Sequence, residues 1–262
     1  MENSSPSPTS PGSPIVYAPD AFGVGSTILA AAGGLIAFIV PVFIGVIVWF
    51  ALNGTAAVGL NRAMVGLFGI GLQSAAEVVV ILYLIVVLPA IAKRPLRDLG
   101  FRSPASSDTG KIVAAIVAMF LLVTALGSVL STVLHFKTPE LAIAVFQHMQ
   151  GWQKVLFAIF AIVVGPVWEE FVFRIFLFNA MRNWWGFWPG AIVSSILFGL
   201  AHAQPPFTPV MFVALSLPLA VGGVILCTVY ARTGSAWSNI ITHASFNGLS
   251  LLLITVAPQL AK

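Results

Sequence analysis

The sequence predicts an all-α protein, a polytopic bundle of about seven transmembrane helices within a range of six to eight. Of the 262 residues, 59% are hydrophobic and only 8% are charged, whereas a soluble domain carries about a quarter charged residues. The mean hydropathy is +1.02. Because the apolar residues form runs near the roughly 20 residues that cross a bilayer as a helix, an ordinary soluble domain is excluded.

The chain is predicted to begin with a flexible tail, residues 1–25, whose first part is mostly Ser and Pro and cannot bury enough apolar surface to fold. It is not a signal peptide, because the first basic residue is Arg62 and a charged n-region is missing. Seven apolar segments follow, the fifth of them short: Ser26–Leu52, Ala63–Ala92, Ile112–Leu134, Lys154–Ala180, Trp188–Ala203, Val210–Tyr230 and Ser235–Ala257.

The connection His135–Gln153 joins the third and fourth segments. Its apolar positions stand among polar residues at helical spacing, which is typical of an amphipathic helix lying on the outer membrane surface. An ordinary loop helix explains the pattern equally well. The apolar positions are Leu141, Val145, Phe146 and Met149.

The distribution of Lys and Arg predicts the orientation, since cytoplasmic loops carry the excess of basic residues. One side receives seven basic residues: Lys93, Arg94, Arg97, Arg102, Lys111, Arg182 and Arg232. The other side receives four: Arg62, Lys137, Lys154 and Lys262. We therefore expect a multi-pass protein of the cell (inner or plasma) membrane, with its N-terminus in the cytoplasm.

Several classes of partner and cofactor are excluded by composition. Twelve Lys and Arg spread thinly over the chain form no nucleic-acid patch. Cys227 is the only cysteine and lies in an apolar run, so a disulfide framework and a zinc site of the CxxC kind are both excluded. Membrane lipid is the expected surrounding partner.

Ionisable and amide side chains inside the predicted spans mark the candidate site, because such groups are costly in the membrane and functional by default. They are Glu77 in the second span, Glu169, Glu170 and Arg174 in the fourth, His202 in the fifth, and His243 and Asn247 in the seventh.

Three of the spans place their polar residues at a similar depth. Counted from Arg182, Trp188 and Arg232 at the predicted cytoplasmic end, Glu169, His202 and His243 lie roughly 20, 21 and 16 Å deep at about 1.5 Å per residue. This level is near the middle of a hydrocarbon core about 30 Å thick. The sequence therefore predicts that they form one site.

The spacing within the fourth span separates two carboxylates. Glu170 and Arg174 are four residues apart and share a helix face, so they can pair. Glu169 is rotated about 100° from Glu170 and is left for chemistry. Pro166 is expected to kink the helix and to open a pocket around Glu169.

The combined set suits hydrolysis of a peptide bond. A carboxylate and an imidazole can take a proton from water and return it to a leaving amine. His243 and Asn247 are four residues apart and present two hydrogen-bonding groups on one stripe of the helix, and His and Asn donors can stabilise an oxyanion. Glu169, His202 and His243 would equally suit a zinc ion whose fourth ligand is water.

Each residue also has a structural interpretation. Glu170 with Arg174 can be a buried pair that fixes helix packing, and His202, His243 or Asn247 alone can be an interhelical hydrogen-bonding group. Their coincidence at one depth favours the functional interpretation.

Glu77 has no partner at a matched position and is expected to pack or to face a cavity. His135 and His148 are expected to be solvated. Three tryptophans are expected to be interface anchors: Trp184, Trp185 and Trp188.

Three motifs on successive apolar spans resemble the signature of the CAAX protease and bacteriocin-processing (CPBP, or ABI) family, the type II CAAX prenyl endopeptidases. The resemblance covers roughly residues 154–255. The motifs are Glu169-Glu170-x-x-x-Arg174, Phe198-x-x-x-His202 and His243-x-x-x-Asn247.

The resemblance implies an intramembrane endopeptidase whose site opens toward the cytoplasm. By position, Glu169 would activate water with His202 as partner, His243 and Asn247 would stabilise the oxyanion, and Arg174 would hold the first motif through Glu170. Phe198 would be a supporting residue. The implied substrate is a membrane-associated or prenylated peptide or protein.

The resemblance also divides the chain into a tail (1–25), N-terminal transmembrane helices with the basic loop and the amphipathic segment (26–153), and a protease core (154–262). No cofactor is required on this interpretation, and Zn²⁺ is the alternative. Asn is a poor zinc ligand and a good oxyanion donor, which favours the metal-independent glutamate mechanism.

Two other function classes stay open at this point. One is a catalytically silent immunity or scaffold protein of the same fold, in which loss of Glu169 or His202 would be expected. The other is a proton-coupled or metal transporter, which predicts polar residues at several depths. Other intramembrane protease classes are unsupported, because the sequence lacks HExxH, Gly-x-Ser-Gly and Gly-x-Gly-Asp motifs.

Overall fold

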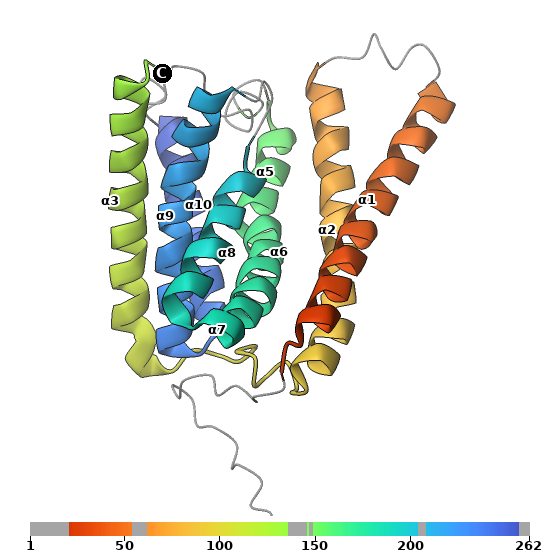
Figure 1. Ribbon diagram of the computed structural model, residues 1–262. Helices are drawn as coiled ribbons and strands as arrows, with labels where there is room; N and C mark the ends of the chain where they lie inside the picture. The colour runs from red at the N-terminus through yellow and green to blue at the C-terminus, as the bar shows by residue number, and fades with distance from the viewer. Residues whose placement is uncertain (1–20, 54–61, 136–145, 147–148, 204–207, 257–262) are drawn as a thin grey trace, which may run out of the picture.

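The computed structural model describes residues 21–53, 62–135, 146, 149–203 and 208–256 (Figure 1). The regular elements in these ranges are all helical. In chain order they are α1 (Val24–Asn53), α2 (Arg62–Ala92), η2 (Ser106–Asp108), α3 (Thr109–Val133), α5 (Trp152–Ile159), η3 (Phe160–Val164), α6 (Gly165–Glu170), η4 (Phe171–Phe178), α7 (Asn179–Trp185), α8 (Phe187–Ala201), α9 (Pro209–Thr233) and α10 (Ala236–Val256).

Six helices in the described part are long and apolar enough to cross a membrane. One of them is the continuous stretch Trp152–Trp185, which runs from α5 to α7. The predicted fifth span is the exception, because α8 has 15 residues and rises only about 22 Å at 1.5 Å per residue. The polytopic helical bundle is confirmed, with six full-length spans and one short apolar helix.

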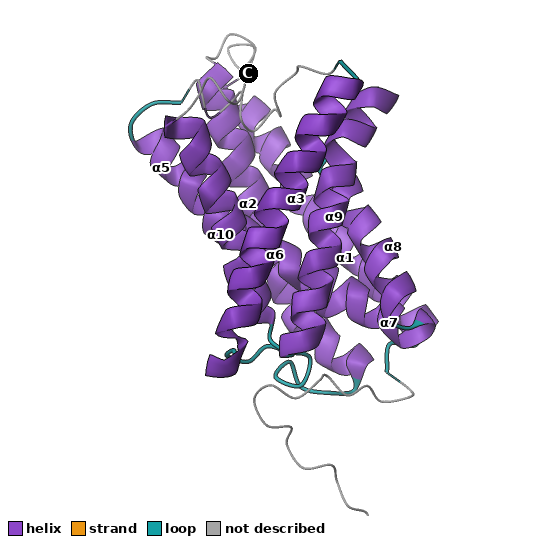
Figure 2. Cartoon of the chain, turned by 90° about the vertical axis from the view of Figure 1, so that its left-hand side faces the viewer, coloured by secondary structure: helices purple, strands orange, loops and turns teal. Residues whose placement is uncertain are grey.

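The helices run side by side, with connections at the two ends of the bundle (Figure 2). Helices α8, α9 and α10 pack around the Trp152–Trp185 stretch, α3 packs on the outer side of α9 and α10, and α1 and α2 form a hairpin beside the stretch. In Figure 1, α1 leans away from the other helices towards its C-terminal end. The hairpin therefore forms a separate wall beside a unit of five helices, which are α3, the Trp152–Trp185 stretch, α8, α9 and α10.

The basic loop after α2 lies at the same end of the bundle as the turn between α9 and α10. Arg102 Nε donates to the Gly234 carbonyl oxygen at 2.9 Å, and Lys111 Nζ donates to the Arg232 carbonyl oxygen at 3.4 Å. Arg182 in α7 is next to Asn183, which reaches the start of α1. The seven basic residues predicted to face the cytoplasm thus occupy segments at one end, called the basic end below.

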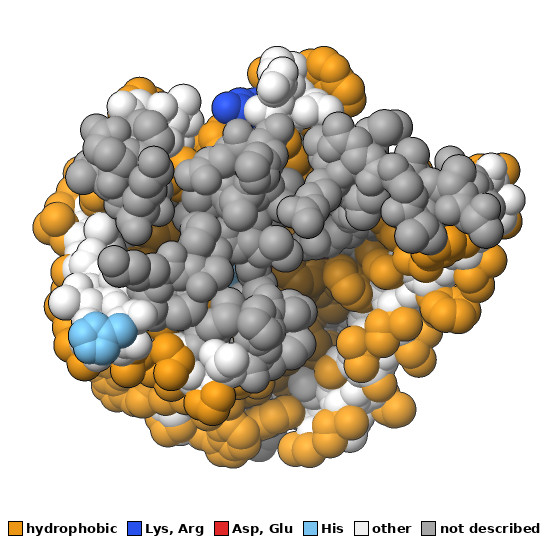
Figure 3. Space-filling model, turned by 90° about the horizontal axis from the view of Figure 1, so that it is seen from above, with side chains coloured by type: hydrophobic (Ala, Val, Ile, Leu, Met, Phe, Trp, Pro, Cys, Tyr) orange, Lys and Arg blue, Asp and Glu red, His pale blue; other side chains and the backbone are white. Residues whose placement is uncertain are grey.

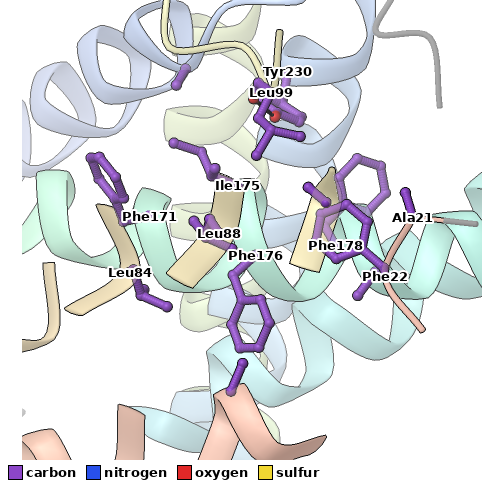
Figure 4. Packing of buried hydrophobic residues seen from close by; sticks show 14 of the residues in the cluster. Ala21, Phe22, Leu84, Leu88, Leu99, Phe171, Ile175, Phe176, Phe178 and Tyr230 are labelled. Atoms are coloured by element: carbon purple, nitrogen blue, oxygen red, sulfur yellow. Dashed lines mark hydrogen bonds between the residues drawn. The ribbon is translucent and has the colours of Figure 1, made fainter. Parts of the chain in front are cut away.

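A hydrophobic cluster closes the bundle at the basic end (Figure 4). Phe22 is fully buried in it, together with Leu88, Leu99 and Phe178. The backbone of Phe22 donates to the Ile91 carbonyl oxygen at 2.9 Å.

The predicted tail therefore extends too far. Residues 1–20 lie outside the described residues, but Ala21 and Phe22 are buried and the helix already begins at Val24. Trp184 Nε1 donates to the Phe22 carbonyl oxygen at 2.6 Å, so this tryptophan holds the chain start in place. Trp185 and Trp188 are exposed, as expected of interface anchors.

Most of the predicted amphipathic segment 135–153 lies outside the described residues. Phe146 and Met149 are buried against Phe157 at the start of the fourth span. His135 is exposed at the end of α3, in agreement with its predicted solvation.

Small residues let α8 and α9 approach each other closely, as is common between membrane helices. A Cβ atom on Gly199 would overlap the backbone carbonyl oxygen of Ser216. One on Gly223 would lie 2.8 Å from the Ser195 Cβ atom. This close contact fixes the C-terminal end of α8, where His202 follows.

We expect Gly199→Ala to destabilise the protein by about 1–3 kcal/mol, the usual cost of overpacking, since the Ser216 backbone cannot give way. Thermal unfolding in detergent measures the effect. Gly127→Ala in α3 is the control, because a Cβ there meets nothing within 4 Å. Equal unfolding temperatures for the two variants would show that α8 and α9 do not pack in this way.

Candidate active site

Glu169 and Glu170 end the short helix α6, which lies between two π-helical stretches, η3 and η4. Pro166 stands near the start of α6 and has no N–H to donate, so the α-helical hydrogen-bond register changes there. Local π-helix is rare and often occurs at functional sites. The predicted irregularity at Pro166 is thus present, as a change of helix type on both sides of the two carboxylates.

Glu170 is fully buried and contacts side chains of its own membrane span and of α10. Its Oε1 lies 3.1 Å from Arg174 Nη1 and 3.0 Å from His243 Nδ1, and its Oε2 accepts a hydrogen bond of 2.8 Å from Asn239 Nδ2. Glu170 and Arg174 are both fully buried. Arg174 and Asn239 are hydrogen-bond donors, and the contact with the Arg174 guanidinium is of the charge-assisted kind, which is the stronger one.

The ring of Phe198 covers Arg174, whose guanidinium carbon lies 4.4 Å from the ring centroid. The same ring contacts His202 and His243, with centroid distances of 4.8 and 5.7 Å. Phe198 therefore packs against Arg174 and both histidines and helps to fix their position.

His243 connects the two glutamates. Its Nδ1 faces Glu170, and its Nε2 lies 3.4 Å from Glu169 Oε2. A carboxylate only accepts hydrogen bonds, so the contact with Glu170 places a proton on Nδ1. Nε2 is then the atom of His243 that meets Glu169.

His202 caps the C-terminus of α8 and reaches Glu169 from the opposite side. Its Nδ1 lies 2.8 Å from the Phe198 carbonyl oxygen, which can only accept, so Nδ1 carries a proton. Its Nε2 lies 3.5 Å from Glu169 Oε1. Each oxygen of Glu169 thus faces the Nε2 atom of one histidine, with each ring held in a defined tautomer by a second contact.

Asn247 lines the same cavity as Glu169 and His202. Its Nδ2 donates one hydrogen to the Ala161 carbonyl oxygen in η3 at 2.8 Å. An amide nitrogen carries two hydrogens, so the second one is left for an acceptor in the cavity.

A cavity of about 910 Å³ lies between the α1–α2 hairpin and the helices that carry Glu169, His202 and Asn247. The side chains of Glu169 and His202 are 15% and 24% exposed in it. Leu84 and Phe176 line the cavity and also belong to the hydrophobic cluster that closes the basic end. From the opposite end, the surface is hollowed among apolar side chains (Figure 3).

The structure brings the sequence-predicted residues together, with one addition. Glu169, Glu170, Arg174, His202 and His243 are linked by direct contacts. The sequence analysis did not identify Asn239, whose side-chain amide donates a hydrogen bond to Glu170. Its signal was an amide in an apolar span, four residues before His243 and therefore on the same helix face.

The zinc alternative would use Glu169, His202 and His243, whose donor types suit zinc. Among the described side chains, no group of three or more His, Cys, Asp or Glu residues is arranged to hold a metal ion. The Nε2 atom of His202 lies against Oε1 of Glu169, and the Nε2 atom of His243 lies against Oε2.

Comparison with known proteins covers the part of the chain that carries this site. "Putative membrane peptidase YdiL" of Bacillus subtilis (strain 168) is 29% identical over 98 residues, 37% of each chain. "Membrane-embedded CAAX protease MroQ" of Staphylococcus aureus (strain USA300) is 34% identical over 113 residues, 41% of this chain and 42% of that relative. The chain therefore spans about two fifths of the length of these relatives.

No solved structure matches the chain. A family model does match it, over residues 151–249, and this region contains the three motifs and Asn239. The resemblance indicated by the motifs is thereby confirmed: residues 151–249 match the Rce1-like family of type II CAAX prenyl endopeptidases.

Proposed function

We propose that this protein is an intramembrane endopeptidase that hydrolyses a peptide bond with a glutamate-activated water. One observation carries the proposal: the Glu169 carboxylate faces a cavity and has the Nε2 atom of a histidine at each oxygen. The family match of residues 151–249 supports the reaction class.

The first step is activation of water by Glu169. A water in the cavity gives a proton to the carboxylate while its oxygen attacks the carbonyl carbon of the substrate. His202 orients Glu169 and shares its proton through Nε2, because its Nδ1 is committed to the Phe198 carbonyl oxygen. The contacts of 3.4–3.5 Å around Glu169 are of the kind that tighten when substrate binds.

The second step is stabilisation and collapse of the tetrahedral intermediate. The carbonyl oxygen gains the charge, and His243 Nε2–H and the second N–H of Asn247 donate to it. This role requires a proton on both ring nitrogens of His243, because Nδ1–H already donates to Glu170 Oε1. The C–N bond then breaks, and the proton held by Glu169 and His202 passes to the leaving nitrogen, giving a carboxylate and an amine.

Glu170, Arg174 and Asn239 act as positioning residues. They hold His243 through Glu170 Oε1 and keep that carboxylate paired in a water-poor interior. Glu170 therefore takes no proton from water, and Glu169 alone of the pair is exposed to the cavity.

The cavity suits an apolar substrate in the membrane. Its lining is mainly Ala, Gly, Val, Leu, Ile, Phe and Trp, and a second hollow of about 470 Å³ between α1 and α2 adjoins it at Phe38, Gly69 and Gln73. We infer a membrane-associated or lipidated peptide or protein as substrate, with prenylated proteins as one class.

We infer from the basic residues that the basic end faces the cytoplasm. The expectation that the site itself opens to the cytoplasm stays a prediction. Between the cavity and the basic end lies the packed cluster of Leu88, Phe178 and Phe22. Substrate entry through the gap beside the hairpin, within the bilayer, avoids this obstacle.

Replacement of the base tests the proposal. We expect Glu169→Gln to lower kcat by about 10²- to 10⁴-fold, the usual contribution of general acid–base catalysis. Cleavage of fluorogenic peptides, prenylated and unprenylated, by the detergent-purified protein measures it. His135→Ala should keep full activity because His135 is exposed at the end of α3. Unchanged turnover in Glu169→Gln would exclude the mechanism, and an inactive wild type would favour a silent scaffold.

The oxyanion role of Asn247 predicts a specific kinetic effect. Asn247→Ala should lower kcat by about 10²- to 10³-fold, the effect of one lost oxyanion donor, with little change in KM. Asn183→Ala is the matched control, because Asn183 bonds the Ala21 carbonyl oxygen away from the cavity. An increase in KM without a loss of kcat would assign Asn247 to substrate binding instead.

Metal analysis separates the glutamate mechanism from the zinc alternative. We expect the purified protein to contain no stoichiometric zinc by mass spectrometry and to keep its activity after dialysis against a chelator. If zinc is present at one per chain, and activity is lost on chelation and restored by zinc, then Glu169, His202 and His243 hold the metal. Zinc would in that case supply Lewis-acid activation of the water.

A further inference from the structure

Glu77 is a buried carboxyl group that the proposed mechanism does not use. It lies on α2, outside residues 151–249, and is only 1% exposed. Its side chain and that of Gln73, one turn earlier, line the cavity that also contains Glu169 and His202. The two polar groups of α2 thus stand on the hairpin wall, across the cavity from the catalytic wall.

The carboxyl group of Glu77 is only half satisfied. Gln73 Nε2 donates to Oε1 at 2.9 Å and fixes the orientation of the group. Within the described part of the chain, Oε2 is buried and has no hydrogen-bond partner. A buried acceptor without a donor is unfavourable. The unpaired Oε2 of Glu77 therefore points to a donor that arrives from outside the chain.

We propose that Glu77 Oε2 accepts a main-chain N–H of the bound peptide substrate, with Gln73 as its positioning residue. This inference rests on the proposed endopeptidase function and deepens it. It makes α2 the wall that aligns the peptide, while the wall of residues 151–249 cleaves it.

The chemistry of the cavity favours a main-chain donor. A peptide that enters a water-poor cavity must find acceptors for its N–H groups as well as donors for its carbonyls. The catalytic wall supplies donors to the scissile carbonyl through His243 and Asn247. The hairpin side of the cavity is otherwise Ala, Gly, Val, Leu, Ile and Phe, so Glu77 and Gln73 are its only polar side chains among the described lining residues.

Two substitutions at one position test the proposal by kinetics. Glu77→Leu removes the acceptor and should raise KM about tenfold while kcat stays within about twofold, since one hydrogen bond of ordinary strength is lost. Glu77→Gln keeps an acceptor oxygen and should stay within about threefold of the wild-type KM. Ser74→Ala, whose hydroxyl bonds only Ile70 of its own helix, should leave KM unchanged.

A structural role for Glu77 gives the opposite pattern. Because the carboxyl is half unsatisfied, Glu77→Leu should unfold at the same temperature as wild type or higher. A lower unfolding temperature with an unchanged KM would overturn the proposal. An equal loss in Glu77→Gln and Glu77→Leu, confined to peptides with Lys or Arg, would overturn it in favour of a cationic side chain as the ligand.

A binding experiment separates this proposal from the proposed function. The probe is a fluorescein-labelled, uncharged decapeptide, farnesylated or not, bound to the Glu169→Gln protein and N-methylated at one amide at a time. Methylation at one position should weaken binding about tenfold, and the loss should vanish when Glu77→Leu is added. Equal losses with and without Glu77 would overturn the proposal even if cleavage is established.

Discussion

The charge of Glu170, buried among membrane-spanning helices, is the constraint that the rest of the site satisfies. An unpaired carboxylate is not tolerated there, because the membrane interior offers no water to solvate it. Arg174 supplies the countercharge from the same helix, and Asn239 and His243 supply hydrogen bonds from α10. Removing one partner of such a buried pair typically costs about 3–5 kcal/mol. Glu170 therefore ties the fourth span to α10 in one register.

That register determines where Glu169 stands. The neighbouring carboxylate is turned away from the buried network and into the cavity, and His243 bridges the two because its ring nitrogens face opposite sides. The π-helical turns on either side of α6 make this arrangement fit, since they change the rotation of the helix around the two glutamates. The carboxylate that we propose as the base is thus positioned by its buried neighbour, Glu170.

The short helix α8 has a related role. It ends at Ala201, so His202 turns its Nδ1 back to the Phe198 carbonyl oxygen that the helix end leaves without an intrahelical donor. Gly199, one residue after Phe198, allows α9 to pack directly against this end. A full-length span would carry this helix end past the level of Glu169, and the histidine would lose its fixed tautomer.

Much of the fold could be predicted from the sequence because membrane spans are defined by composition. The hydropathy limits of the first and last spans, 26–52 and 235–257, differ from α1 and α10 by at most two residues. The pairing of Glu170 with Arg174 followed from their spacing of four residues. Both are local properties, which a sequence states directly.

What the sequence did not reveal depends on contacts between distant segments. Phe22 looked like part of a polar tail, yet Trp184, 162 residues away, fixes its backbone. Asn239 looked like an isolated amide until α10 placed it against Glu170. The π-helical stretches have no sequence signature apart from Pro166, because the packing of neighbouring helices selects them.

The division of the cavity into two walls has a consequence for specificity. The wall that carries the proposed catalytic residues lies within residues 151–249, the part that matches the family. The facing wall, formed by α1 and α2, lies outside that match. It supplies Glu77, Gln73 and a set of apolar lining residues. Changes in the hairpin can therefore alter which peptide is held without touching Glu169 or its histidines. The proposed reaction and the choice of substrate are then assigned to different helices of one fold.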